Sequence, residues 1–222
     1  MSLTERYKRV ISLLNQSIPK AETELKYNNP YELLVAVILS AQCTDKRINA
    51  VTPSLFNRFP TPEALAAASE EEIYEYLRSV SYPNAKTHNL SLMAKRLVEV
   101  YQSVVPSDTA ELQTLAGVGR KTANVIASVI FKQAKMPVDT HVHRVSARLG
   151  LTKNAKNVRQ TEEQLMKNLK GYDIALLHHQ LILHGRYVCK ARKPLCTDCV
   201  LKDCCLFYEN QQKEHQNFFP VK

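Results

Sequence analysis

The sequence predicts an all-α protein, and three observations carry this prediction. Apolar residues recur at helical spacing along most of the chain, and no segment sustains the alternation typical of a strand. Five glycines in 222 residues are too few for the turns of a β-sandwich, and no single loop holds the three glycines of a dinucleotide-binding fingerprint. We therefore expect about ten helices joined by short loops.

Composition favours a globular protein with a polyanionic partner. Apolar residues make up 45% of the chain and charged residues 23%, which allows a packed core. The net charge of +9 favours a partner such as nucleic acid. The N-terminal segment reads as an amphipathic helix interrupted by Arg6, Lys8 and Arg9, and the longest apolar run, 33–39, is too short for a membrane span. We expect a cytoplasmic protein without a membrane partner.

Helix starts can be recognised from capping residues. Asn29 followed by Pro30 is typical of an N-terminus, because Asn caps the free backbone N–H groups and Pro fits the first turn. Ser69 with Glu72 predicts a capping box at the start of another helix.

Two glycines one residue apart, Gly117 and Gly119, lie between a short expected helix over 109–115 and a longer one over 119–131. Glycine permits positive φ and close approach of another backbone. The second helix would offer free N–H groups and the positive end of its dipole, which bind phosphate without reading sequence. A tight turn between core helices is the simpler explanation of the two glycines taken alone, but the basic pair Arg120-Lys121 favours phosphate binding.

Five of the six cysteines lie close together near the C-terminus, which favours a metal site over a disulfide framework in a cytoplasmic protein. Four of them follow the pattern C-x6-C-x2-C-x5-C, and these are Cys189, Cys196, Cys199 and Cys205. Their spacing suits either one tetrahedral zinc ion or one iron–sulfur cubane. Cys204 could replace Cys205 as a ligand, although the spacing favours Cys205.

Four motifs in this order resemble the endonuclease III family of the helix-hairpin-helix DNA glycosylase superfamily: SAQCTDKRIN, LQTLAGVGRKTANVI, VDTHVHRV and LILHGRYVC with its cysteines. The resemblance covers residues from about 20 to 206. It implies a bifunctional DNA glycosylase and abasic-site lyase for oxidised pyrimidines, acting as a monomer on double-stranded DNA with a damaged base or an abasic site. It also implies that the four cysteines hold a [4Fe-4S] cluster.

The resemblance assigns catalysis to Lys121 and Asp139. A lysine amine can attack a sugar C1′ and form a Schiff base, and the helix dipole with Arg120 disfavours the unreactive ammonium form. Asp139 would support the cationic transition state. Taken alone, the two residues have simpler explanations, since Lys121 could contact phosphate and Asp139 could cap the helix that follows it.

The predicted DNA contacts fall into three groups. The resemblance implies that Gln42 and Tyr82 fill the gap left by an extruded nucleotide, although many relatives carry an aliphatic residue where Tyr82 stands. The other two groups are the hairpin and a basic loop held by the cysteines, and their predicted contact residues are Leu115, Gly117, Val118, Gly119, Arg120, Lys190, Arg192 and Lys193.

We expect two lobes: a central helical domain over 23–133, and a cluster lobe formed by 1–22 with 134–208. Residues 209–222 would form a flexible tail. One alternative function is a monofunctional adenine-mismatch glycosylase, whose relatives generally lack the lysine. Another is a non-catalytic DNA-binding protein with a structural zinc site.

Overall fold

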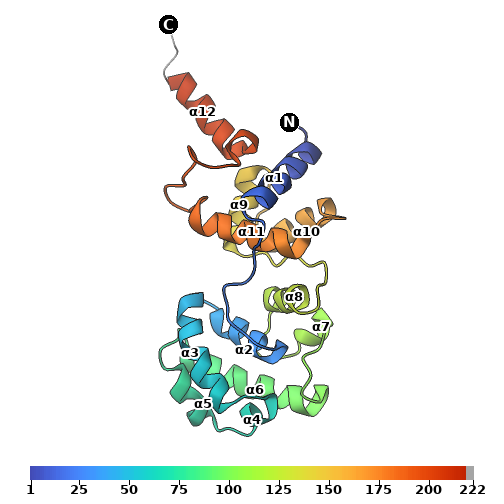
Figure 1. The fold of residues 1–222 in the computed structure, drawn as a ribbon, viewed down its shortest axis with the longest axis vertical. Helices are drawn as coiled ribbons and strands as arrows, with labels where there is room; N and C mark the ends of the chain where they lie inside the picture. Colours follow the sequence, from blue (N-terminus) through green and yellow to red (C-terminus); the bar gives the residue numbers. More distant parts are fainter. Residues whose placement is uncertain (219–222) are drawn as a thin grey trace. The chain divides into compact units, whose positions relative to one another are not determined.

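The computed structural model describes residues 1–218, with side chains as far as Lys213, and every regular element in this range is helical (Figure 1). The all-α prediction is therefore confirmed. Contacts between Cα atoms divide the chain into two compact units. We call Thr23–Gln133 the hairpin unit, and Met1–Glu22 together with the chain from Ala134 onward the cysteine unit. Each unit has its own apolar core.

The hairpin unit is built around one buried helix. Its helices are α2 (Pro30–Ser40), α3 (Asp45–Arg58), α4 (Pro62–Ala66), α5 (Glu70–Leu77), α6 (Pro83–Tyr101), α7 (Thr109–Leu112) and α8 (Arg120–Val129). Helix α2 is buried continuously over Tyr31–Leu39, and it packs against α3, α6 and α8. The predicted start of α2 is confirmed, because the Asn29 side chain accepts a hydrogen bond from the Glu32 N–H at 2.9 Å.

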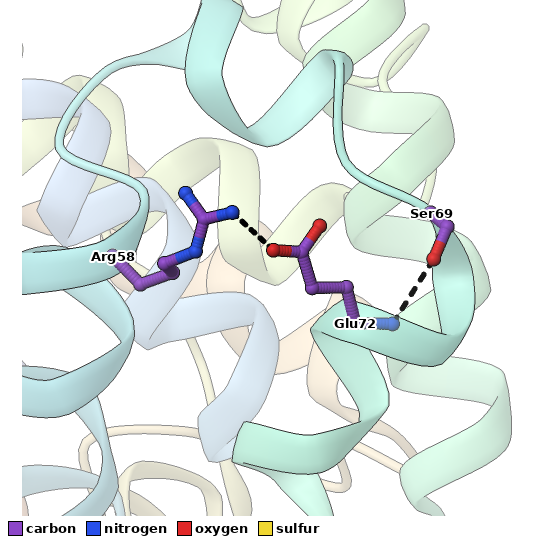
Figure 2. Close-up of polar contacts among 3 residues, drawn as sticks. All are labelled: Arg58, Ser69 and Glu72. Carbon is purple, nitrogen blue, oxygen red and sulfur yellow. Dashed lines mark hydrogen bonds and ion pairs between the residues drawn. The ribbon is translucent and has the colours of Figure 1, made fainter.

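Only the Ser69 half of the predicted capping box at α5 is formed. Ser69 is the N-cap, and its hydroxyl accepts a hydrogen bond from the Glu72 N–H at 3.2 Å. The Glu72 carboxylate, however, pairs with the guanidinium of Arg58, the last residue of α3, as Figure 2 shows. The side chain therefore ties α5 to α3 instead of returning to its own N-cap. Both partners are exposed, so this ion pair contributes little to stability.

The cysteine unit joins the first helix to the C-terminal part of the chain. Its helices are α1 (Leu3–Ser17), α9 (Thr140–Leu149), α10 (Val158–Asn168), α11 (Ile174–Tyr187), the 3₁₀ helix η1 (Lys202–Cys204) and α12 (Leu206–Phe218). The buried Arg6 guanidinium of α1 donates to the carbonyl oxygens of Leu149 at 3.1 Å and Cys204 at 2.6 Å. These bonds attach α1 to the end of α9 and to the cysteine segment.

The segment that is expected to form a flexible tail begins within a helix. Residues 209–218 continue helix α12, which begins at Leu206. An ion pair one helical turn apart, between Lys213 and Glu209 at 2.7 Å, supports the helix where apolar periodicity is weak. Residues 219–222 of the expected tail lie outside the described residues. In the described part of the chain, no helix is long and apolar enough to span a membrane.

Candidate functional site

The glycine hairpin lies between α7 and α8, and both helices are shorter than expected. A pair of tight turns replaces the end of the first helix, since the Leu115 N–H donates to Leu112 and the Val118 N–H donates to Leu115, each at 3.1 Å. Gly117 has φ +77°, and a Cβ at this position would lie 3.1 Å from Cγ2 of Ile38. The fold itself therefore requires glycine at residue 117.

Gly119 is different, because the fold leaves space around it. It is the N-cap of α8, with φ −87° and no side-chain cap. A Cβ at this position would meet no atom within 4 Å in the described structure. The first N–H groups of α8 follow directly, and these are the groups that a helix leaves without intrahelical partners. The surface at Gly119 is thus open to an anion that approaches the backbone closely.

The predicted hairpin residues divide between core and surface. Leu115 and Val118 are buried in the core of the hairpin unit, so their side chains shape the turn and cannot reach a ligand. Any contact they make would come from their backbone. Arg120 and Lys121 are exposed in the first turn of α8.

Asp139 is the N-cap of α9, and its Oδ1 accepts a hydrogen bond from the Val142 N–H at 2.8 Å. The capping prediction is therefore confirmed. The carboxylate is half-buried, with Oδ1 held by the backbone. Asp139 belongs to the cysteine unit and Lys121 to the hairpin unit, so their approach to each other stays a prediction.

Gln42 and Tyr82 lie on two loops that the fold ties together within the hairpin unit. Both residues are exposed and both have left-handed backbones, with φ 53° at Gln42 and 55° at Tyr82. Such a backbone is unfavourable for residues other than glycine and clusters at functional sites. The Ser81 hydroxyl donates to the Gln42 carbonyl oxygen at 2.7 Å. The structure therefore places the two predicted DNA-inserting residues on adjoining loops.

The four predicted cysteine ligands line one pocket of the cysteine unit. Its wall also includes Leu149, His184, Val188, Pro194, Leu195, Lys202, Phe207 and Tyr208. Cys204 faces elsewhere: it is buried, and its thiol donates to the Leu201 carbonyl oxygen at 3.3 Å. The pocket thus separates Cys205 from its neighbour in the way the spacing predicts. Within the described residues, no cluster of His, Cys, Asp or Glu closes tightly enough for a single metal ion.

Burial and mutual repulsion disfavour thiolates in this pocket. Burial raises the pKa of Cys199 to about 11, and the other cysteines of the pocket add to the effect. Burial also raises the pKa of Cys196 and of Cys205. Polar groups already point at the sulfur atoms: the Leu201 N–H donates to Cys199 Sγ at 3.4 Å, and Arg148 donates to Cys189 Sγ at 3.5 Å. Four thiolates in this pocket need a positively charged group between them.

His184 also borders the pocket, with Nε2 3.7 Å from Cys199 Sγ. Burial lowers the pKa of His184 to about 4, so the imidazole is neutral at pH 7.

The predicted basic loop leaves the pocket at Cys189, and Lys190, Arg192 and Lys193 are all exposed on it. The Arg148 guanidinium of α9 holds the loop, because it donates to the carbonyl oxygens of Lys190 at 2.7 Å and Ala191 at 3.0 Å. The same guanidinium lies 4.8 Å from the centre of the Phe207 ring. The loop is thus fixed at its backbone while its charges face solvent.

Comparison with known proteins identifies the family. Residues 35–171 match the model described as HhH-GPD superfamily base excision DNA repair protein. Endonuclease III of Rickettsia prowazekii (strain Madrid E) is 42% identical over 202 residues, which are 91% of this chain and 95% of the relative. Endonuclease III of Bacillus subtilis (strain 168) is 42% identical over 201 residues, 90% and 92% of the two chains. The chain belongs to the endonuclease III family.

A solved structure of a trapped endonuclease III–DNA covalent intermediate, an estranged-adenine complex, has the same fold. It matches with a TM-score of 0.89 and 39% identity, covering 96% of this chain and all of the other. The predicted helix-hairpin-helix architecture is confirmed by this match to the endonuclease III fold.

Two residues of this endonuclease III family chain make contacts at the site that the sequence did not predict. Lys86 is buried, and its amine bonds to the loops of Gln42 and Tyr82. Arg148 holds the basic loop at the cysteine pocket. For Arg148 the sequence offers a clue. Arg144 lies one helical turn earlier on α9, so the two arginines share one face of the helix. For Lys86 no local pattern distinguishes it from the other 29 basic residues.

Proposed function

We propose that the protein is a bifunctional DNA glycosylase and abasic-site lyase that removes oxidised pyrimidines from double-stranded DNA in base excision repair. The observation that carries this proposal is the position of Lys121. It stands exposed in the first turn of α8, two residues after an open glycine, in a chain about 40% identical to endonuclease III over nine-tenths of its length. We expect it to act as a monomer on bacterial nucleoid DNA.

Lys121 would act as the nucleophile. Its neutral amine attacks C1′ of the damaged nucleotide, the N-glycosidic bond breaks, and the base leaves with the bonding electrons and takes up a proton. The nitrogen then loses a proton and forms a C=N bond to C1′, the C1′–O4′ bond breaks, and O4′ takes up a proton. The product is an open-chain sugar joined to Lys121 as a Schiff base. Removal of a C2′ proton then breaks the C3′–O bond and nicks the strand, and water releases the lysine.

Asp139 would assist these steps from the N-cap of α9. Its Oδ1 accepts a hydrogen bond from the Val142 N–H, which fixes the orientation of the carboxylate. A fixed negative charge stabilises the oxocarbenium-like transition state, and the carboxylate can carry the protons that leave the amine and C2′.

DNA would be held at three places. The open backbone at Gly119 and the first turn of α8 take one phosphate, and the loop of Lys190, Arg192 and Lys193 takes others. Gln42 and Tyr82 enter the duplex where the damaged nucleotide leaves the stack, and the Tyr82 ring stacks on a base, which is worth roughly 1–3 kcal/mol.

The four cysteines of the pocket would hold a [4Fe-4S] cluster. Four thiols that line one pocket are the donor set that a cubane requires, and the positive charge of iron would keep the buried thiols ionised. When bound, the cluster supplies a fixed scaffold for the loop that carries Lys190, Arg192 and Lys193, so its main role is structural. Zinc also binds four thiolates and is the alternative, although no cluster among the described residues is closed around a single ion.

The two adjacent cysteines allow a direct test of the cofactor. We expect Cys205→Ser to lose the brown colour and the broad visible absorption of the purified protein, because it removes a pocket thiol. Cys204→Ser should keep both, since this thiol bonds to the Leu201 carbonyl oxygen outside the pocket. Visible absorption and iron analysis of the two variants check the assignment. A colourless, zinc-containing wild type would contradict the cluster.

Gly119→Ala should fold but bind DNA poorly. The added methyl group meets no atom of the described structure, yet it projects into the space where a phosphate would approach. Loss of one close phosphate contact should weaken binding to an abasic duplex about tenfold, with a stability cost of about 1 kcal/mol or less. Fluorescence anisotropy and thermal unfolding measure the two effects. Gly117→Ala is the contrast, because the left-handed backbone at residue 117 and the tight contact with Ile38 should lower the melting temperature.

Wild-type activity tests the proposal as a whole. Sodium borohydride should trap a covalent adduct between the protein and a duplex with one abasic site, and the protein should release an oxidised pyrimidine and nick the strand. A monofunctional adenine-mismatch glycosylase would instead release adenine opposite 8-oxoguanine without an adduct. A non-catalytic protein would bind the duplex and leave it intact, so the absence of both reactions would falsify the proposal.

A further inference from the structure

Lys86 is a buried lysine at the start of α6. Its side chain is nearly covered, with 5% of the residue exposed. Burial lowers the pKa of its amine, and the nearby Cys43 opposes this effect. A buried amine is unfavourable unless it bonds to polar groups, so its partners indicate why the position holds lysine.

Both partners of the amine belong to the loops that carry the predicted DNA-inserting residues. Lys86 Nζ donates to the Ala41 carbonyl oxygen at 2.9 Å and to the Ser81 hydroxyl at 3.2 Å. Ala41 immediately precedes Gln42, and Ser81 immediately precedes Tyr82. The Ser81 hydroxyl continues the chain of bonds to the Gln42 carbonyl oxygen at 2.7 Å. One amine therefore joins the residues before both insertion sites.

The site of attachment favours a cation. Ala41 is the C-cap of α2, where the helix leaves its last carbonyl oxygens exposed and its dipole is negative. The Lys86 amine donates to this C-cap, while its own N–H donates to the Tyr82 carbonyl oxygen at 3.1 Å. Lys86 thus bonds through its side chain to both loops and through its backbone a second time to the Tyr82 loop.

The two loops need such support. Gln42 and Tyr82 both hold left-handed backbones, with φ 53° and 55°, that neither residue adopts readily. Tyr82 starts α6 without a side-chain cap, and its side chain is 64% exposed, so its ring has little packing of its own. A loop of this kind changes conformation unless surrounding bonds hold it.

We propose that Lys86 is a positioning residue that locks the Gln42 and Tyr82 loops to each other, so that both side chains enter the duplex as one rigid pair. This inference rests on the proposed function for the insertion itself. The mechanical link between the loops does not depend on DNA. Rigid insertion matters because small displacements of positioning groups lower rates strongly.

The first experiment measures the loop directly and uses no DNA. The protein has no tryptophan, so Tyr82→Trp introduces a single fluorescent probe at the loop. Adding Lys86→Met, which keeps the chain length and removes the amine, should increase nanosecond motion of the probe in anisotropy decay. Lys95→Met in the same background is the matched control, because Lys95 is exposed on the same helix. Equal probe motion in both double variants would overturn the proposal.

The second experiment asks whether the lock serves extrusion. With Tyr82 intact, Lys86→Met should process an oxidised pyrimidine in duplex DNA about tenfold more slowly than wild type. Borohydride trapping on a single-stranded abasic oligonucleotide, where no base pair must open, should stay within about twofold. Equal losses on both substrates would indicate general destabilisation and contradict the positioning role.

Ser81→Ala provides a smaller change for both measurements. It removes the bonds that the hydroxyl makes and keeps the Lys86–Ala41 bond. Probe motion should therefore increase, and excision from duplex DNA should slow, by less than in Lys86→Met. If wild type traps no adduct, the proposed function fails, while the anisotropy comparison still decides whether Lys86 locks the loops.

Discussion

Replacing Lys121 should abolish covalent trapping. Lys121→Ala removes the proposed nucleophile, so we expect no borohydride adduct on abasic DNA and a loss of roughly 10³-fold or more in strand nicking. Denaturing gel electrophoresis after borohydride treatment measures the adduct, and a labelled duplex measures nicking.

Lys121→Arg separates the nucleophile from its charge. Arginine keeps a cation near the phosphate, but its guanidinium stays protonated and cannot form the Schiff base. This variant should bind abasic DNA with nearly wild-type affinity and form no adduct. Lys132→Ala, at another exposed lysine of the same unit, should trap normally. An adduct with Lys121→Arg would place the nucleophile elsewhere.

Asp139→Asn should separate chemistry from capping. Asn caps a helix about as well as Asp, so the bond from the Val142 N–H and the melting temperature should be retained. Loss of the negative charge and of the proton acceptor should lower turnover by about 10²–10⁴-fold. Thermal unfolding, DNA binding and single-turnover excision measure the three properties.

Asp139→Ala is the companion variant, because it removes the cap as well. It should lose turnover like Asp139→Asn and also about 1 kcal/mol of stability. If Asp139→Asn keeps full turnover, Asp139 is a cap without a role in the chemistry.

Neighbouring residues that look alike in sequence take different roles in the structure. Gly117 and Gly119 are the same residue type, two positions apart. The left-handed backbone and the contact with Ile38 require glycine at position 117, whereas a Cβ at position 119 would meet no atom within 4 Å in the described structure. Cys204 and Cys205 are adjacent, but Cys205 lines the pocket and Cys204 does not. The physical reason is burial, which depends on residues far away in the chain.

The helix caps also separate contacts that the sequence predicts from contacts that depend on tertiary packing. The sequence identifies Asn29, Ser69 and Asp139 as N-caps, because a cap bonds to backbone two or three residues away. It does not identify the partner of the Glu72 carboxylate, because Arg58 lies 14 residues earlier and meets it through tertiary packing.

Local sequence patterns predict the helical class, the helix starts, the glycine hairpin, the cysteine spacing and the family. All of these depend on residue types at short, fixed separations, where periodicity and backbone geometry act locally. Packing between distant segments buries Leu115 and Val118, places Arg148 against the basic loop, and brings Lys86 to two loops that lie about 40 residues apart in the chain. A side chain's partner and its exposure are set by which distant segments pack around it, and no local pattern carries that information.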